Sequence, residues 1–219
     1  MNRPLRSSVA ALLALSLGWG APVAAQSVAG PYLAARQAAV QNDFSTAASY
    51  FTQALVRDPG NIALMDNAVV SFLSLGQIER AVPIAKSLEA SGQITQMAQM
   101  ALTADLVAQE DYAALLERDV EAQGIGPLVD GLIRAWAHMG QGEAREALAQ
   151  FDRISTEVGL QGFAMFHKAM ALALVGDFEG AEAIFAEDGA GVMVQTRRGA
   201  MARAEILSQL GVSAEEMPV

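Results

Sequence analysis

The sequence predicts an all-α fold, a stack of about five helix–turn–helix units that ends in a capping helix. Three observations predict it. A short turn-like segment recurs along the chain, and the first residues of its five copies are separated by 34, 34, 32 and 34 positions. Apolar residues lie at helical spacing before each copy, as Met65, Ala68 and Phe72 do. Hydrophobic residues make up 53 % of the 219 positions and charged residues 17 %, which supplies a large core and excludes a chain that is disordered by composition.

The first 25 residues differ from the rest and predict a secretory signal peptide. Arg3 and Arg6 give a positive start, residues 9–17 form an apolar run, and small residues follow up to Ala25. The apolar run is shorter than the ~20 residues of a membrane-spanning helix, which disfavours the alternative of an uncleaved anchor. We expect cleavage after Ala25, export to the periplasm of a Gram-negative bacterium, and no membrane insertion afterwards.

Charge and cysteine content exclude several classes of function. The formal net charge of the whole chain is −10. Removing residues 1–25 takes away two arginines and no acid, which leaves 24 acidic against 12 basic residues, a net charge of −12. Such a chain repels phosphate backbones, so nucleic acid is not an expected partner. The absence of cysteine excludes disulfides, thiolate metal sites and a lipid-bearing cysteine.

Each predicted unit is a helix, a tight turn and a second helix. The five turn segments are Asn42-Asp43-Phe44, Gly76-Gln77-Ile78, Glu110-Asp111-Tyr112, Gly142-Glu143-Ala144 and Gly176-Asp177-Phe178. In the second helices, a small residue that allows close helix approach is expected to be followed four positions later by an aromatic residue that fills the space between units. The predicted units are residues 28–61, 62–95, 96–127, 128–161 and 162–193. A capping helix over 192–210 completes a repeat domain of 26–210, and a tail of 211–219 follows.

These residues resemble the tetratricopeptide repeat (TPR) family. The family pattern is most complete in the first unit, as Ala35, Ala47, Phe51 and Pro59. The later packing residues that correspond to it are Ala81, Ala147, Phe151, Ala181 and Phe185. The resemblance implies a right-handed superhelical solenoid whose first helices line a concave groove for peptides or partner segments. The third unit departs from the pattern with Leu115 and Asp119, and Pro83 inside a predicted helix suggests a kink.

Some first helices carry a second apolar stripe in addition to the one needed for packing. Its members are Met97, Met100, Val107, Phe163, Phe166, Met170 and Leu174, with Trp136 and Met139 added in one of the two registers that the 32-residue step allows. By resemblance this stripe lines the groove, and methionine and aromatic side chains suit an adaptable apolar surface. The alternative is internal packing within a tightly wound superhelix, under the C-terminal helix, or in a homodimer.

No pattern of catalytic, metal-binding or cofactor-binding residues is found. His138 and His167 do not have metal-ligand spacing with acids. The two triplets Gly140-Gln141-Gly142 and Gly189-Ala190-Gly191 lack the preceding strand and the lysine of a phosphate-binding loop. The family's clamp for a carboxyl terminus is represented only by Arg36 and Asn67. The sequence therefore predicts a non-enzymatic scaffold without metal or cofactor, which binds an apolar or basic segment of another envelope protein. A self-associating homodimeric module is the alternative, and a hydrolase or ligand-binding protein built from scattered acids is a third.

Overall fold

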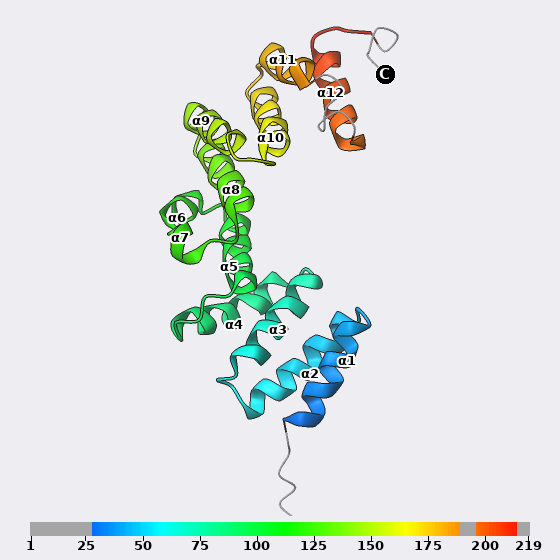
Figure 1. Cartoon of the computed structure of the whole chain (residues 1–219), viewed down its shortest axis with the longest axis vertical. Coiled ribbons are helices and arrows are strands. Elements are labelled where there is room, and N and C mark those ends of the chain that lie inside the picture. The colour runs from blue at the N-terminus through cyan, green and yellow to red at the C-terminus, as the bar shows by residue number, and fades with distance from the viewer. Residues whose placement is uncertain (1–27, 189–195, 214–219) are drawn as a thin grey trace, which may run out of the picture.

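A computed structural model describes residues 28–188 and 196–213, and the regular structure in these two ranges is entirely helical (Figure 1). The predicted signal peptide, the start of the predicted capping helix and the end of the predicted tail lie outside these ranges. The helices are α1 (Ala29–Val40), α2 (Phe44–Arg57), α3 (Ile62–Ser74), α4 (Ile78–Ala90), α5 (Gln96–Ala108), α6 (Tyr112–Glu117), α7 (Val120–Gln123), α8 (Pro127–Gly140), α9 (Ala144–Ser155), α10 (Gln161–Leu174), α11 (Phe178–Asp188) and α12 (Arg197–Gln209). Consecutive helices pack as antiparallel pairs, which confirms the predicted all-α repeat solenoid.

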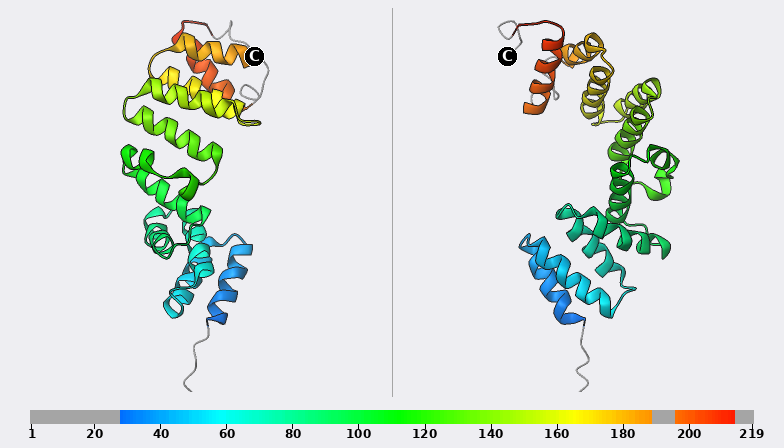
Figure 2. Two further views of the ribbon diagram at one scale, coloured as in Figure 1. Left: turned by 60° about the vertical axis from the view of Figure 1, so that its left-hand side comes forward. Right: turned by 180° about the vertical axis from the view of Figure 1, so that it is seen from behind.

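The stack is curved. In Figure 1 the two ends of the helical stack, α1 with α2 and α10 to α12, lie on the same side of the middle helices, and the right panel of Figure 2 shows the same bend from behind. Helices α6 and α7 project from the opposite, convex side, while α5 and α8 lie toward the concave side. The first helices of the middle repeats thus line the inside of the curve.

The five turns share one geometry. The first residue of each turn has a left-handed backbone conformation, with φ between 55° and 86°, at Asn42, Gly76, Glu110, Gly142 and Gly176. The next residue donates its backbone N–H to the carbonyl five positions earlier over 2.9–3.0 Å, which closes a Schellman motif at the end of every first helix. In three turns this second residue is an aspartate whose carboxylate caps the next helix by accepting a backbone N–H, at Asp43, Asp111 and Asp177. A short sequence pattern therefore both ends one helix and starts the next.

The small and aromatic residues of the repeat pattern lie between the helices. Fully or almost fully buried are Ala35, Ala47, Phe51, Ala81, Ala147, Phe151, Ala181 and Phe185. Pro59 is exposed in the turn between α2 and α3, where its ring cannot continue a helix. Helix α4 runs as one element from Ile78 to Ala90 through Pro83, whose side chain faces solvent.

The second helix of the third repeat is broken. Helix α6 has only 6 residues and ends at Glu117, and the backbone of the next residue, Arg118, is extended with ψ 135°. Asp119 then caps the four-residue helix α7 by accepting the backbone N–H groups of Glu121 and Ala122. Asp119 stands where the first, fourth and fifth repeats have a buried phenylalanine, and it starts a new helix instead.

The apolar core is divided at the same place. Among the described residues, one buried cluster draws on α1 to α5 and extends to Leu102. A second draws on α8 to α10 and begins at Ala135, and a third draws on α10 to α12. The second and third clusters share α10, whereas the first shares no helix with either. The solenoid consists of an N-terminal lobe and a C-terminal lobe joined through the broken repeat.

Candidate partner-binding surface

Ten residues of the first helices occupy equivalent positions from repeat to repeat. We call them the inner stripe. Its two rows are Tyr32, Asp66, Met100, Leu132 and Phe166, and Arg36, Val70, Ala104, Trp136 and Met170. Within each helix the two members are four residues apart, so they lie on one helical face. From Val70 onward the inner stripe carries no charged side chain.

The structure places the predicted groove residues in three environments. Those that pack against a core cluster are Met97, Trp136, Met139, Phe166 and Met170. Three others are strongly exposed, with exposed fractions of 48 % for Val107, 52 % for Phe163 and 69 % for Leu174. Met100 is half-buried and belongs to none of the three clusters. The second apolar stripe is therefore partly internal, and its exposed members lie on α5 and α10.

Trp136 belongs to a group of aromatic rings that joins repeats four and five. Its ring lies edge-on to Phe151 at 5.8 Å and to His167 at 6.0 Å between ring centroids, and Phe166 stands edge-on to His167 at 5.5 Å. Trp136 Nε1 donates a hydrogen bond to His167 Nδ1 over 3.1 Å. The sequence left open whether Trp136 faces the core or the groove. In the structure its ring packs against Phe151 and His167.

The indole hydrogen bond requires an unprotonated Nδ1 on His167. Burial of the ring, and after it the positive charge of Arg198 on α12, lower the pKa of His167. Both effects favour the neutral imidazole that can accept from tryptophan. His167 thus has a structural role between two helices. His138 instead pairs with Glu143 at the surface, with 2.7 Å between Nδ1 and Oε2.

Charged residues of the inner stripe are confined to its N-terminal end. Arg36 donates a hydrogen bond to the Tyr32 hydroxyl over 3.3 Å, and its guanidinium lies over the Tyr32 ring at 6.0 Å. Asp66 on α3 is half-buried, and its Oδ1 atom is buried without a hydrogen-bond partner. No ion pair within 4 Å involves Asp66 in the part of the chain that the structure describes.

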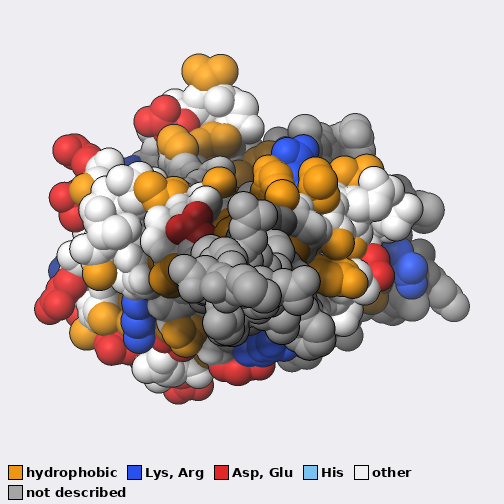
Figure 3. Space-filling model, turned by 90° about the horizontal axis from the view of Figure 1, so that it is seen from below, with side chains coloured by type: hydrophobic (Ala, Val, Ile, Leu, Met, Phe, Trp, Pro, Cys, Tyr) orange, Lys and Arg blue, Asp and Glu red, His pale blue; other side chains and the backbone are white. Residues whose placement is uncertain are grey.

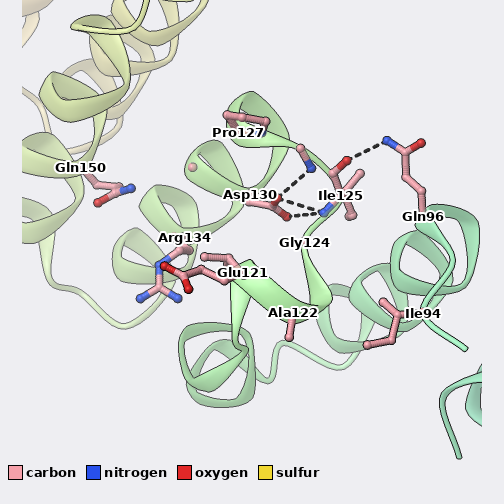
Figure 4. A pocket seen from close by; sticks show the side chains of 13 residues that line it. Ile94, Gln96, Glu121, Ala122, Gly124, Ile125, Pro127, Asp130, Arg134 and Gln150 are labelled. Atoms are coloured by element: carbon pink, nitrogen blue, oxygen red, sulfur yellow. Dashed lines mark hydrogen bonds between the residues drawn. The ribbon is translucent and has the colours of Figure 1, made fainter. Parts of the chain in front are cut away.

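The broken repeat opens a cleft of about 770 Å³ between the two lobes (Figure 4). Ile94, Gln96 and α7 form one wall, and Asp130, Gly131 and Arg134 of α8 form the other. The charged side chains of the second wall form hydrogen bonds with the backbone of the same chain. The Asp130 carboxylate accepts the backbone N–H groups of Ile125 and Gly126 over 2.7–3.0 Å, and Arg134 donates to the Leu116 carbonyl over 2.9 Å.

Side chains hold α7 against the N-terminal lobe. Arg118 donates to Gln99 Oε1 over 2.5 Å, and the Gln123 amide donates to Glu89 Oε1 over 2.8 Å. Gln96 reaches across the cleft to the Ile125 carbonyl over 2.7 Å. This network could not be predicted from the sequence. The only indications were the 32-residue step and the unusual residues Leu115 and Asp119.

The described residues were compared with two kinds of site, a metal centre and a membrane span. No group of three or more histidine, cysteine, aspartate or glutamate side chains in residues 28–188 and 196–213 is arranged to hold a metal ion. In the same ranges, every helix is either too short or too polar to cross a lipid bilayer.

Comparison with known proteins identifies the class of fold. No protein-family model and no curated protein matches the sequence. Among solved structures, the chain is similar to a tetratricopeptide repeat protein from Parabacteroides merdae, with 17 % identity and a TM-score of 0.69 over 85 % of this chain and 74 % of that one. It is also similar to a thermophilic TPR protein from Thermus thermophilus, with 18 % identity and a TM-score of 0.51 over 85 % of this chain and 100 % of that one.

The chain is therefore an all-α repeat solenoid. More narrowly, it has the tetratricopeptide-repeat fold, which confirms the resemblance seen in the sequence at the level of structure. Proteins of this fold commonly act as protein-interaction scaffolds.

Proposed function

We propose that this protein is a non-enzymatic, exported interaction module that binds a segment of a partner protein of the cell envelope along its concave face. The observation that carries the proposal is the exposure of three large apolar side chains, Val107 on α5 and Phe163 and Leu174 on α10. Each lies three or four residues from a member of the inner stripe on the same helix, and therefore on the same helical face. Exposed apolar side chains that gather on one face are typical of interaction surfaces.

The distribution of charge supports the same face. Seen from the N-terminal end, acidic side chains gather along the left-hand edge in Figure 3, which is the convex side of Figure 1, and hydrophobic side chains are more prominent on the right. The inner stripe from Val70 to Met170 adds no charge to that face. Binding there would bury apolar surface without removing a charged group from water.

Site-specific photo-crosslinking in cells tests the concave face. A photoreactive residue at Phe163 or Leu174 is expected to yield a crosslinked partner, whereas the same residue at Ala113, which is exposed on convex helix α6, is the matched control. Equal crosslinking from both faces, or none from Phe163 and Leu174, contradicts the proposal. Export is tested separately by fractionation and by the mass of the purified chain, which is expected to begin at Gln26.

Self-association is the competing use of the exposed apolar residues. Phe163, Leu174 and Met201 are all about half exposed or more in the C-terminal lobe. Sedimentation equilibrium distinguishes the two uses, because a homodimer that dissociates on Phe163→Asp assigns these side chains to an interface between copies. A chain that remains monomeric at all concentrations favours a separate partner.

A further inference from the structure

Asp66 holds a position in the inner stripe that is apolar in the repeats that follow. It precedes Met100 by 34 residues, and Met100 and Phe166 occupy the same position in the third and fifth repeats. On α3, Asp66 lies beside the buried residues Met65 and Val69, so its carboxylate stands at the edge of the apolar core. A carboxylate in this place costs free energy unless a donor or a cation meets it.

The protein itself supplies no such group in the described residues. Asp66 Oδ1 is buried without a hydrogen-bond donor, and no arginine, lysine or histidine nitrogen lies within 4 Å of its carboxylate. The neighbouring cation of the inner stripe, Arg36, donates to the Tyr32 hydroxyl. Native proteins pair most buried polar atoms, so the unpaired oxygen indicates that its partner comes from outside.

The surroundings favour a cation over a neutral donor. After removal of residues 1–25 the chain carries a net charge of −12, which attracts positively charged segments at long range. The next positions of the inner stripe toward the C-terminus, Val70, Met100 and Ala104, are uncharged. A segment lying along the concave face would therefore meet one acidic position and then an apolar surface.

We propose that the segment bound in the groove carries a lysine or arginine that pairs with Asp66, followed at a fixed spacing by apolar side chains that pack on Met100 and beyond. This inference rests on the proposed function of the concave face. Helices α3 and α5 pack against each other, which sets their axes roughly 8–10 Å apart. An extended chain spans at most about 3.3–3.6 Å per residue. The cation and the first apolar side chain of the segment are thus about three residues apart.

Phage-displayed random peptides provide the probe. The mature chain, residues 26–219, is panned beside its Asp66→Asn variant, which keeps the shape of the side chain and removes its charge. Glu79→Gln, at an exposed position on the outer helix α4, is the matched control. Peptides enriched on the wild-type chain are expected to combine a lysine or arginine with an apolar residue about three positions away.

Binding measurements on an enriched peptide then test the pairing. We expect Asp66→Asn to weaken binding about tenfold, which corresponds to about 1.4 kcal/mol, and to reduce its salt dependence. Replacing the basic residue of the peptide by methionine is expected to cost about the same on the wild-type chain and almost nothing on Asp66→Asn. Glu79→Gln should bind as the wild type does. Circular dichroism verifies that each variant is folded.

The outcomes separate the inference from the proposed function. Apolar peptides without a basic residue, bound equally by wild type and Asp66→Asn but lost on Phe163→Asp, overturn the cation pairing and leave the groove in place. Acidic peptides that depend on Arg36 overturn it as well. If no peptide is enriched and crosslinking from Phe163 also fails, both the groove and the pairing are refuted.

Discussion

Arg118→Met is expected to destabilise the protein by about 2 kcal/mol. Arg118 Nη2 donates to Gln99 Oε1 over 2.5 Å and to the Gln123 carbonyl over 3.0 Å. The Gln99 side chain has no exposed surface, so its oxygen would be left unpaired where water cannot replace the arginine. An unpaired buried acceptor costs about 1–3 kcal/mol. The Gln123 carbonyl lies in a half-buried residue that water can reach, so it adds little.

The double variant Gln99→Met with Arg118→Met is the matched control for this reasoning. It removes donor and acceptor together, and such exchanges of a polar pair for apolar groups of similar shape are nearly neutral. Glu89 keeps its hydrogen bond from Gln123 over 2.8 Å in the double variant. We therefore expect the double variant to be more stable than Arg118→Met by about 1 kcal/mol or more.

Urea unfolding followed by far-ultraviolet circular dichroism measures these differences. The reasoning is refuted if Arg118→Met unfolds at the same urea concentration as the wild type, because then the buried oxygen finds another donor. It is equally refuted if the double variant is less stable than Arg118→Met, because the unpaired oxygen of Gln99 would then not be the source of the lost stability.

Three further predictions concern turns, histidine and core. Glu110→Gly should stabilise the protein by about 1 kcal/mol, because Glu110 has φ 55°, and Gly76→Ala at φ 69° should destabilise it by a similar amount. Thermal unfolding measures both changes. Equal melting temperatures for the two variants would contradict the turn geometry. Burial and Arg198 lower the pKa of His167, so the unfolded chain binds the proton more readily than the folded chain does. The contribution of His167 to stability is fully present above a pH of about 6.5 and is lost as the pH falls toward the lower pKa of the folded state. Trp136 fluorescence should change over the same pH range, and His167→Gln should abolish that change. Phe151→Ala, at a fully buried position, should cost about 3–5 kcal/mol in urea unfolding, and a loss below about 1 kcal/mol would contradict its place in the core.

The regular parts of the fold follow from sequence because their causes are local. The turn segments specify a left-handed residue and a cap within three positions, and the spacing of alanine and phenylalanine in the second helices specifies which face packs. The period of about 34 residues then repeats the same solution. All-α architecture, helix pairs and solenoid could therefore be predicted from the residues alone.

The joint between the lobes could not be predicted in the same way. Leu115 and Asp119 show that the third repeat departs from the pattern, yet they do not show that α6 ends after 6 residues. The contacts that hold α7 join residues 19 and 34 positions apart, Gln99 with Arg118 and Glu89 with Gln123. Neither the repeat period nor helical spacing predicts that these side chains form hydrogen bonds. Such polar pairs depend on the final position of several helices at once.

The candidate groove could be predicted from the sequence only in part. Helical spacing groups Phe163, Phe166, Met170 and Leu174 on one face, but spacing alone does not distinguish the members covered by neighbouring helices from the exposed ones. Exposure is decided by how α12 and the adjacent repeats pack, as Phe166 against Phe185 illustrates. The environment of Asp66 is likewise visible only in three dimensions.

The divided core bears on the order in which the chain folds as it emerges during synthesis. The N-terminal cluster is built from α1 to α5 alone, so it is complete once residue 108 has emerged. The C-terminal half, by contrast, holds two clusters that share α10, and the second is complete only once α12 has emerged. Folding from the N-terminus is thus expected to produce a compact leading half while the trailing half is still extended, with residues 109–126 as the connection between them.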